Sequence, residues 1–131
     1  MANKQLLNVV GSIGQDNLIA KLTPAAETFG IKINKLAAGD DTVIERGTVL
    51  CADENGKYSV FSGAEGTVPS AILTEPVTVT TAEDVTAVAY RSGNFNRKAL
   101  IMGGDHTLTV SDEDALRKYD IILTDMIAAN E

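Results

Sequence analysis

Hydrophobic and polar residues alternate, or short β-branched runs recur, over most of the chain from residue 31 onward. At 31–34, for example, two isoleucines alternate with a lysine and an asparagine, which is the pattern of a strand with one buried face. Clusters of Gly, Asp, Asn and Ser separate these segments and favour turns. We expect strands at 31–36, 48–52, 57–61, 71–73, 77–79, 85–90 and 121–124. Several short strands of this kind are typical of a small β-sandwich or barrel-like domain, so the predicted fold is mainly β.

The strands predicted at 48–52 and 57–61 are joined by Asp-Glu-Asn-Gly at positions 53–56. An Asn-Gly pair tolerates the positive φ angles that a type I′ turn requires at both of its central residues. We therefore predict a β-hairpin closed by a type I′ turn.

One short helix is predicted near the C-terminal end of the chain. Ser111 is a favourable N-cap residue, acidic residues follow at 112–114, and basic residues lie at 117 and 118. This order of charge complements the helix dipole, and Ser111 with Asp114 approximates a capping box. Ala115, Leu116 and Tyr119 are expected to face the core.

The first thirty residues differ from the rest of the chain. They contain two short apolar patches, 6–10 and 18–22, separated by a glycine-containing segment at 11–14. Neither patch has an obvious partner nearby. Two interpretations remain open: an extended N-terminal arm that becomes ordered against another protein, or an ordinary pair of N-terminal strands.

Composition excludes several classes of function. The chain has 131 residues, 44% of them hydrophobic and 22% charged, which suits one compact domain or one domain with a short arm. A net charge of −7 and an aromatic content of 5% without Trp argue against a nucleic-acid partner. No apolar run approaches the roughly 20 residues of a membrane-spanning helix. The N-terminal segment lacks the pattern of a signal peptide, so we expect synthesis in the cytoplasm of the producing cell.

No arrangement of residues predicts catalysis, a cofactor or a metal site. Cys51 lies in an apolar run and is interpreted as a small buried hydrophobe. His106 is interpreted as a loop histidine entering a strand, and the neighbouring Asp105 would point to the opposite face of that strand. The acids at 112–114 point about 100° apart on a helix and do not converge on one cation. Lys57 follows a hairpin turn, but it belongs to the return strand and does not match a carrier lysine at a turn tip. A binding or structural module is therefore expected, and not an enzyme.

Several segments, taken in order, resemble a known family. They are Arg-Gly-Thr-Val-Leu at 46–50, Gly-Lys-Tyr at 56–58, Ala-Ile-Leu-Thr-Glu at 71–75, Ala-Val-Ala-Tyr-Arg-Ser-Gly at 87–93 and Asn-Phe-Asn-Arg-Lys-Ala-Leu at 94–100. A short helix and then Asp120-Ile121 follow. This order is similar to tailed-phage head decoration proteins of the lambda type and to related prophage capsid and head-fibre proteins, over about residues 42–122.

The resemblance implies a structural virion protein that binds the outer surface of a phage capsid and stabilises the expanded head. The implied partners are the major capsid protein and further copies of this chain, commonly in a homotrimer, with a dimer as the alternative. In such families N-terminal arms add strands to the edges of capsid proteins. The resemblance thus implies an arm at 1–30, a β-rich decoration domain at 31–131, and no partner among nucleic acids or membranes.

Candidate contact residues follow from the arm interpretation. The apolar residues of the arm that could be buried against a capsid subunit are Leu6, Leu7, Val9, Val10, Ile13, Leu18 and Ile19. Candidate contacts between copies of the chain are Asn94, Phe95 and Asn96, although Phe95 is equally well explained as a core residue. An alternative function is a head-fibre base, or a β-sandwich that binds a glycan or host-surface ligand, which would require exposed aromatic side chains.

Overall fold

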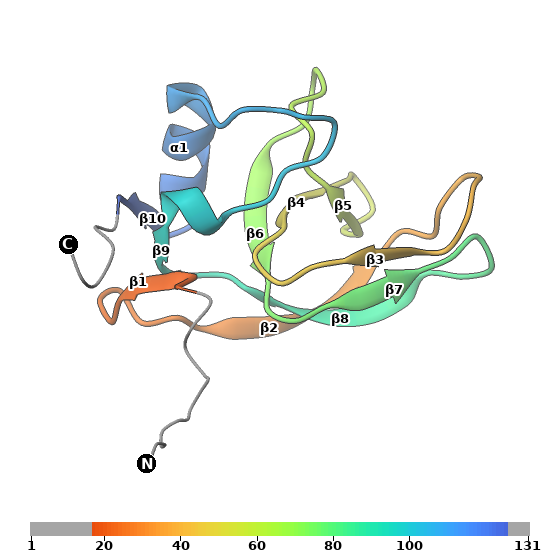
Figure 1. Cartoon of the computed structure of the whole chain (residues 1–131), viewed down its shortest axis with the longest axis horizontal. Coiled ribbons are helices and arrows are strands. Elements are labelled where there is room, and N and C mark those ends of the chain that lie inside the picture. The colour runs from red at the N-terminus through yellow and green to blue at the C-terminus, as the bar shows by residue number, and fades with distance from the viewer. Residues whose placement is uncertain (1–16, 126–131) are drawn as a thin grey trace, which may run out of the picture.

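A computed structural model describes residues 17–125, which form ten strands, one 3₁₀ helix and one α-helix (Figure 1). The elements in chain order are β1 (Ile19–Lys21), β2 (Thr28–Ile33), β3 (Thr42–Ile44), β4 (Val49–Ala52), β5 (Tyr58–Val60), β6 (Pro69–Leu73), β7 (Val77–Val79), β8 (Val85–Tyr90), β9 (Gly93–Asn96), η1 (Arg97–Ala99), α1 (Val110–Arg117) and β10 (Ile121–Thr124). The predicted mainly β fold with one short helix near the C-terminal end is confirmed.

Five of the strands form a closed barrel in the order β2-β5-β4-β6-β8. Neighbouring strands are antiparallel except at the closure, where β2 and β5 are parallel and pair only at Ile33 and Tyr58. Alternate residues of the strands point inward, as their hydrophobic alternation predicts. The barrel core includes Ile31, Leu50 and Leu73, which are almost fully buried.

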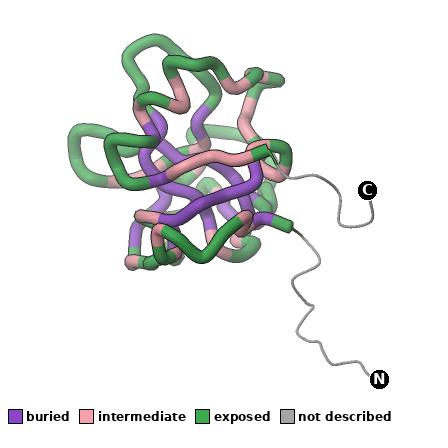
Figure 2. The backbone as a smooth tube through the Cα atoms, turned by 90° about the vertical axis from the view of Figure 1, so that its left-hand side faces the viewer, coloured by how far each residue is buried: buried purple, intermediate pink, exposed green. Residues whose placement is uncertain are grey.

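The two remaining sheets lie on opposite sides of the barrel (Figure 1). The ribbon of β3 and β7 is antiparallel and adds Ile44 and Val79 to the barrel core. The terminal sheet has the order β1-β9-β10 and lies beside α1. A second core forms here, around Phe95 and Leu116. Figure 2 shows the buried segments crossing the middle of the molecule, with exposed loops around them.

The hairpin between β4 and β5 forms as predicted, but its turn is not of type I′. Of the turn residues only Gly56 has a positive φ, of 79°, whereas a type I′ turn needs positive φ at both central residues. The Gly56 N–H donates to the Asp53 carbonyl (3.1 Å). The Asp53 carboxylate also accepts the N–H groups of Asn55 and Lys57. The aspartate side chain organises this turn, and the glycine ends it.

The helix begins two residues earlier than predicted. Thr109, and not Ser111, is the N-cap: its hydroxyl accepts the Asp112 N–H (3.1 Å), and the Asp112 carboxylate accepts the Thr109 N–H (3.0 Å). This is a complete capping box. Leu116 faces the core as expected, but Tyr119 lies beyond the last helical residue and is 48% exposed, so its predicted burial is wrong.

The expected division of the chain at residue 30 falls inside β2, which runs from Thr28 to Ile33 without a break. Residues 28–33 pair with β8 along their whole length. Part of the segment interpreted as an arm is therefore paired with the β-rich domain. Of that segment, residues 17–30 are described and residues 1–16 lie outside the described residues.

Replacing Leu50 by Ala should lower the free energy of unfolding by about 2–5 kcal/mol, because Leu50 is fully buried in the barrel and the truncation leaves a cavity. The matched control is Val43→Ala, at a side chain that is 54% exposed, which should change stability by less than about 1 kcal/mol. Urea denaturation monitored by circular dichroism measures both variants. Equal losses in the two variants would contradict the assignment of the core.

Candidate functional site

The described residues that the sequence singled out for contact with partners come together in the terminal sheet. In the antiparallel pairing of β1 with β9, Ile19 lies opposite Phe95, and Lys21 lies opposite Asn94. The Asn96 N–H donates to the Leu18 carbonyl (2.8 Å). We call residues 18–23 the arm root. Leu18 and Ile19 of the expected arm and the expected contacts between copies are thus partners of each other within one chain.

Two of these side chains are buried in the protein's own core. Leu18 is 2% exposed and Phe95 is fully buried, and both belong to the cluster around Leu116 and Ile121. Ile19 is half-buried and packs against the same cluster. Leu18 and Phe95 therefore act within the protomer, and the interpretation of Phe95 as a core residue is confirmed. The other apolar residues proposed for the arm lie outside the described residues; they are Leu6, Leu7, Val9, Val10 and Ile13.

The two asparagines of β9 are also buried, and their side-chain amides are hydrogen-bonded within the chain. The Asn94 amide donates to the Thr23 carbonyl (3.3 Å) and accepts the Thr124 hydroxyl (2.7 Å). The Asn96 amide oxygen accepts the Lys98 N–H (3.1 Å) and caps η1. A buried amide needs such partners, because leaving it unpaired is costly. Asn94 thus ties β9 to the arm root and to β10, Asn96 fixes the start of η1, and both present little surface to a second copy.

Gly93 allows Phe95 to occupy this core. Its φ is 146°, and a Cβ atom at this position would lie 2.7 Å from Cζ of Phe95. Any larger residue would therefore displace the ring or the strand. The Phe95 ring in turn lies 5.2 Å from the Tyr90 ring of β8, between their centroids, which joins the terminal sheet to the barrel.

An arginine connects the elements that follow β9. The Arg97 guanidinium forms two hydrogen bonds with the Glu113 carboxylate of α1 (2.9 and 2.7 Å) and an ion pair with Asp125, directly after β10 (2.6 Å). Glu113 first, and then Asp125, raise the pKa of Arg97 above its usual value. The planar fork of an arginine suits such bidentate pairing. Both ends of the described chain are therefore tied to β9 or to the residue that follows it.

Leu22, which the sequence analysis did not select, is the most exposed large hydrophobic residue of the arm root, at 88%. It follows β1 directly, at the point where the chain leaves the pairing with β9. The periodicity of the sequence placed Leu22 with Leu18 in one apolar patch. Only the pairing of Leu18 with β9 separates the buried residue from the exposed one.

His106 lies in a loop, as predicted, but this loop leads into α1 and not into a strand, so that part of the prediction is wrong. Its Nε2 is 2.7 Å from the Asp112 carboxylate, and its ring meets the edge of Phe61 at a centroid distance of 5.3 Å. A Cβ atom added at Gly63 would collide with the imidazole ring. Burial alone would raise the pKa of Asp112, but hydrogen bonds from His106 and Thr109 outweigh burial and lower it. His106 thus contacts both the β5–β6 loop and the helix and connects the two.

The other candidate chemical groups are likewise paired in structural roles. The three acids at 112–114 contact different basic partners: His106, Arg97 and Arg117. Cys51 is buried, as expected, and burial raises the pKa of its thiol. Within residues 17–125 no group of three or more His, Cys, Asp or Glu side chains is arranged to hold a metal ion. None of the helices in that range is long and apolar enough to cross a membrane.

The protein is a small β-barrel domain with a terminal sheet that fixes both ends of the described chain. Residues 25–121 match the family of the bacteriophage lambda head decoration protein D, and the chain belongs to this family. The match begins after β1 and ends at the first residue of β10, so it covers the barrel and α1 but not the arm root. No curated protein matches the chain. The family is one of structural phage proteins and places the protein in the phage capsid.

Replacing Asn94 by Ala should lower the free energy of unfolding by about 1–3 kcal/mol, because the Thr23 carbonyl and the Thr124 hydroxyl each lose a buried partner. A double-mutant cycle with Thr124→Val, measured by urea denaturation, isolates the bond between the two side chains. The double variant should be less destabilised than the sum of the two single variants. Strict additivity would show that this hydrogen bond does not contribute.

The contribution of Asp112 should depend on pH. Because its pKa is lower in the folded than in the unfolded chain, its carboxylate stabilises the fold above about pH 4, the unfolded value, and this stabilisation is lost as the pH falls through the folded pKa. Asp112→Asn should cost about 1 kcal/mol at pH 6. Its unfolding free energy should converge with that of the wild type at lower pH. Urea denaturation from pH 6 to pH 3 tests this, with the exposed Asp105→Asn as the control; a constant difference would contradict it.

Proposed function

We propose that the protein binds the outer surface of a phage capsid and stabilises the expanded head. The observation that carries this proposal is the match to the lambda head decoration family over residues 25–121, which spans the whole barrel. The paired structural roles of the candidate chemical groups fit a protein that works through contact area and hydrogen bonds. A net charge of −7 keeps free copies apart in solution before they assemble.

The physical basis of stabilisation is preferential binding. A protein that binds the expanded shell, and not the compact one, shifts the equilibrium toward the expanded form by about 2.7 kcal/mol per site when its free concentration is 100 times the dissociation constant. Many such sites on one shell act together. The protein is made in the host cytoplasm in this scheme and ends on the outer surface of the virion.

The arm root supports a role for the chain that precedes it. Leu18 and the β1–β9 pairing hold in place the residues that directly follow the segment 1–16. The C-terminal end of that segment is thereby attached to the domain. Fixing one end of an extended segment lowers the entropy that it loses when it binds. We propose that this segment adds a strand to an edge of the major capsid protein, with its apolar residues as the contact groups.

We further propose that the protein associates as a homotrimer, with a dimer as the alternative. Several arms on one oligomer raise the apparent affinity for a shell with repeated sites, because the second contact forms at a high effective concentration. The burial of Asn94, Phe95 and Asn96 within the protomer means that another surface must form the contact. Multi-angle light scattering of the purified protein measures the state directly.

The first experiment is a count of copies per particle by quantitative mass spectrometry on purified virions. A head decoration role requires a copy number comparable to that of the major capsid protein. A few copies per particle would instead fit a head-fibre base or a receptor-binding module. Absence from the particles would overturn the proposal.

Deleting residues 1–14 should leave a folded domain and abolish binding to capsids. The fold should persist because the barrel and the arm root lie within residues 17–125. Circular dichroism and thermal unfolding check the fold, and co-sedimentation with expanded shells measures the binding. If the shortened protein still saturates the shells, the arm does not supply the main contact.

A further inference from the structure

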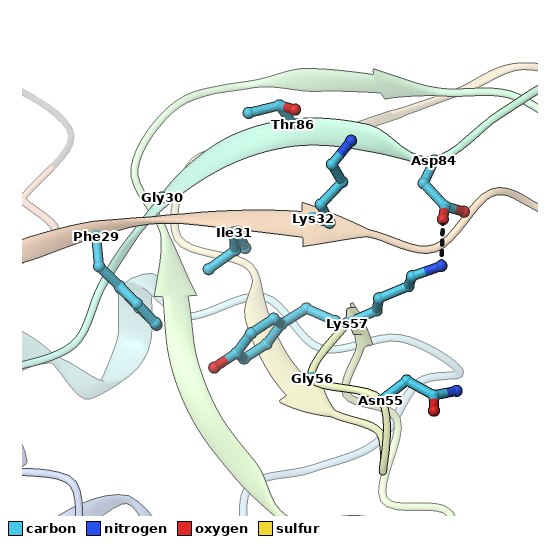
Figure 3. A pocket seen from close by; sticks show the side chains of 10 residues that line it. Phe29, Gly30, Ile31, Lys32, Asn55, Gly56, Lys57, Asp84 and Thr86 are labelled. Carbon is cyan, nitrogen blue, oxygen red and sulfur yellow. Dashed lines mark hydrogen bonds and ion pairs between the residues drawn. The ribbon is translucent and has the colours of Figure 1, made fainter.

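The barrel has a groove at its point of closure, between β2 and the tip of the β4–β5 hairpin (Figure 3). We call this groove the seam; its volume is about 660 Å³. It is lined by β2 on one side, by residues 55–58 on the other, by Thr86 of β8 and by Asp84, which directly precedes β8. The seam exists because β2 and β5 pair only at Ile33 and Tyr58, while β2 pairs with β8 along six residues.

The register shows which backbone groups of β2 face the seam. The Arg91 N–H donates to the Glu27 carbonyl on the β8 side, and the Asn34 N–H donates to the Tyr58 carbonyl on the β5 side. Backbone groups of alternate residues along a strand point to opposite edges. Thr28 and Gly30 therefore direct their backbone N–H and C=O toward the seam. No strand within residues 17–125 pairs with them there.

The side chains of the seam combine an apolar floor with one unpaired cation. Phe29 and Tyr58 meet edge to face at 6.0 Å, and Ile31 is buried between the strands. Lys57 is held by Asp84 at 2.7 Å, as Figure 3 shows. Lys32 is exposed, and among the described residues no carboxylate lies within ion-pair distance of it.

We infer that the seam receives an extended, carboxylate-bearing segment of the capsid shell protein, which adds to the β2 edge at Gly30 and pairs with Lys32. The unpaired edge selects an extended main chain, because only such a chain offers donors and acceptors at the spacing of a strand. The aromatic and aliphatic floor of the seam favours an apolar side chain on the face of the bound segment that points into the seam. This inference rests on the proposed capsid-binding function and assigns it a second contact, separate from the arm.

Charge distinguishes this occupant from the arm of a neighbouring copy. Residues 1–15 contain no Asp or Glu, so the apolar patch at 6–10 brings no carboxylate to Lys32. A segment from another protein supplies what the seam lacks. The arm and the seam are then complementary: the decoration protein donates one strand to the shell and accepts another from it.

Two pairs of variants test the seam, with co-sedimentation on expanded shells of the parent phage as the measurement. Gly30→Pro removes the N–H that faces the seam and spares the bonds to β8, so it should weaken binding at least about tenfold. Gly30→Ala keeps the N–H, and its Cβ would meet no atom within 4 Å, so it should bind like the wild type. Lys32→Glu should weaken binding about fivefold, and Lys35→Glu, which lies outside the seam, less than twofold.

The outcomes separate this inference from the proposed function. If the wild type binds shells and both seam variants bind like their controls, the seam inference is overturned and the capsid-binding function stands. If the wild type does not bind, the function fails and the inference fails with it. Thermal unfolding shows whether Gly30→Pro folds; if it does not, the Lys32 and Lys35 pair decides alone.

A photo-crosslinking residue at Thr28 identifies the occupant. Thr28 is exposed and its backbone faces the seam. Irradiation of decorated shells should yield a crosslink to a shell-protein peptide that contains Asp or Glu, found by mass spectrometry. A crosslink to residues 1–16 of another copy would overturn the assignment of the occupant.

Discussion

The closure of the barrel depends on a small contact between β2 and β5, and the rest of the domain is arranged around it. One backbone pair, Ile33 with Tyr58, joins the strands. The Asn34 amide extends the closure by donating to Asp53 and to Ser59 at 3.0 Å each. These contacts close the barrel around an interior that is built mainly from isoleucine, leucine and valine. Because β2 and β5 pair at only one position, the seam stays open. The barrel buries its core, while part of the β2 edge remains accessible.

Strand β6 connects this barrel to the terminal sheet because it is buried on both faces. Ala71 and Leu73 point into the barrel, whereas Ile72 points the other way and packs in the cluster around Phe95. The two cores therefore share a wall one strand thick. A change in the packing of one core therefore displaces side chains in the other, since close-packed interiors transmit displacement. The family match covers this shared wall and begins after the arm root.

Strands with alternating hydrophobic and polar residues could be predicted from the sequence. Strands that depend on hydrogen bonds between distant parts of the chain could not. Strand β9 reads as Gly-Asn-Phe-Asn, a composition that favours turns. It becomes a strand because the Asn94 amide finds Thr23 and Thr124, which lie 71 and 30 residues away along the chain. Leu18 was placed in the arm for the same reason, because its partners in β9 are distant in sequence. The family could be recognised from the sequence because the order and spacing of several segments matched it, although each segment alone is a common strand-and-turn sequence. The seam could not be predicted from the sequence, because no amino-acid composition distinguishes a strand with an unpaired edge from a fully paired strand.

The terminal sheet also determines how the domain carries a mechanical load. Strand β1 runs antiparallel to β9, and β10 runs parallel to it, so the first residue of β1 and the last residue of β10 lie at the same end of β9, beside Phe95 and Asn96. Hydrogen bonds between antiparallel strands are perpendicular to the strand axis. A pull on the preceding chain along that axis therefore stretches the β1–β9 bonds in shear, all at once, and does not open them one after another. If the chain before β1 is attached to the shell as proposed, a shell under outward pressure would be held by an attachment that resists force collectively and gives way only as a unit.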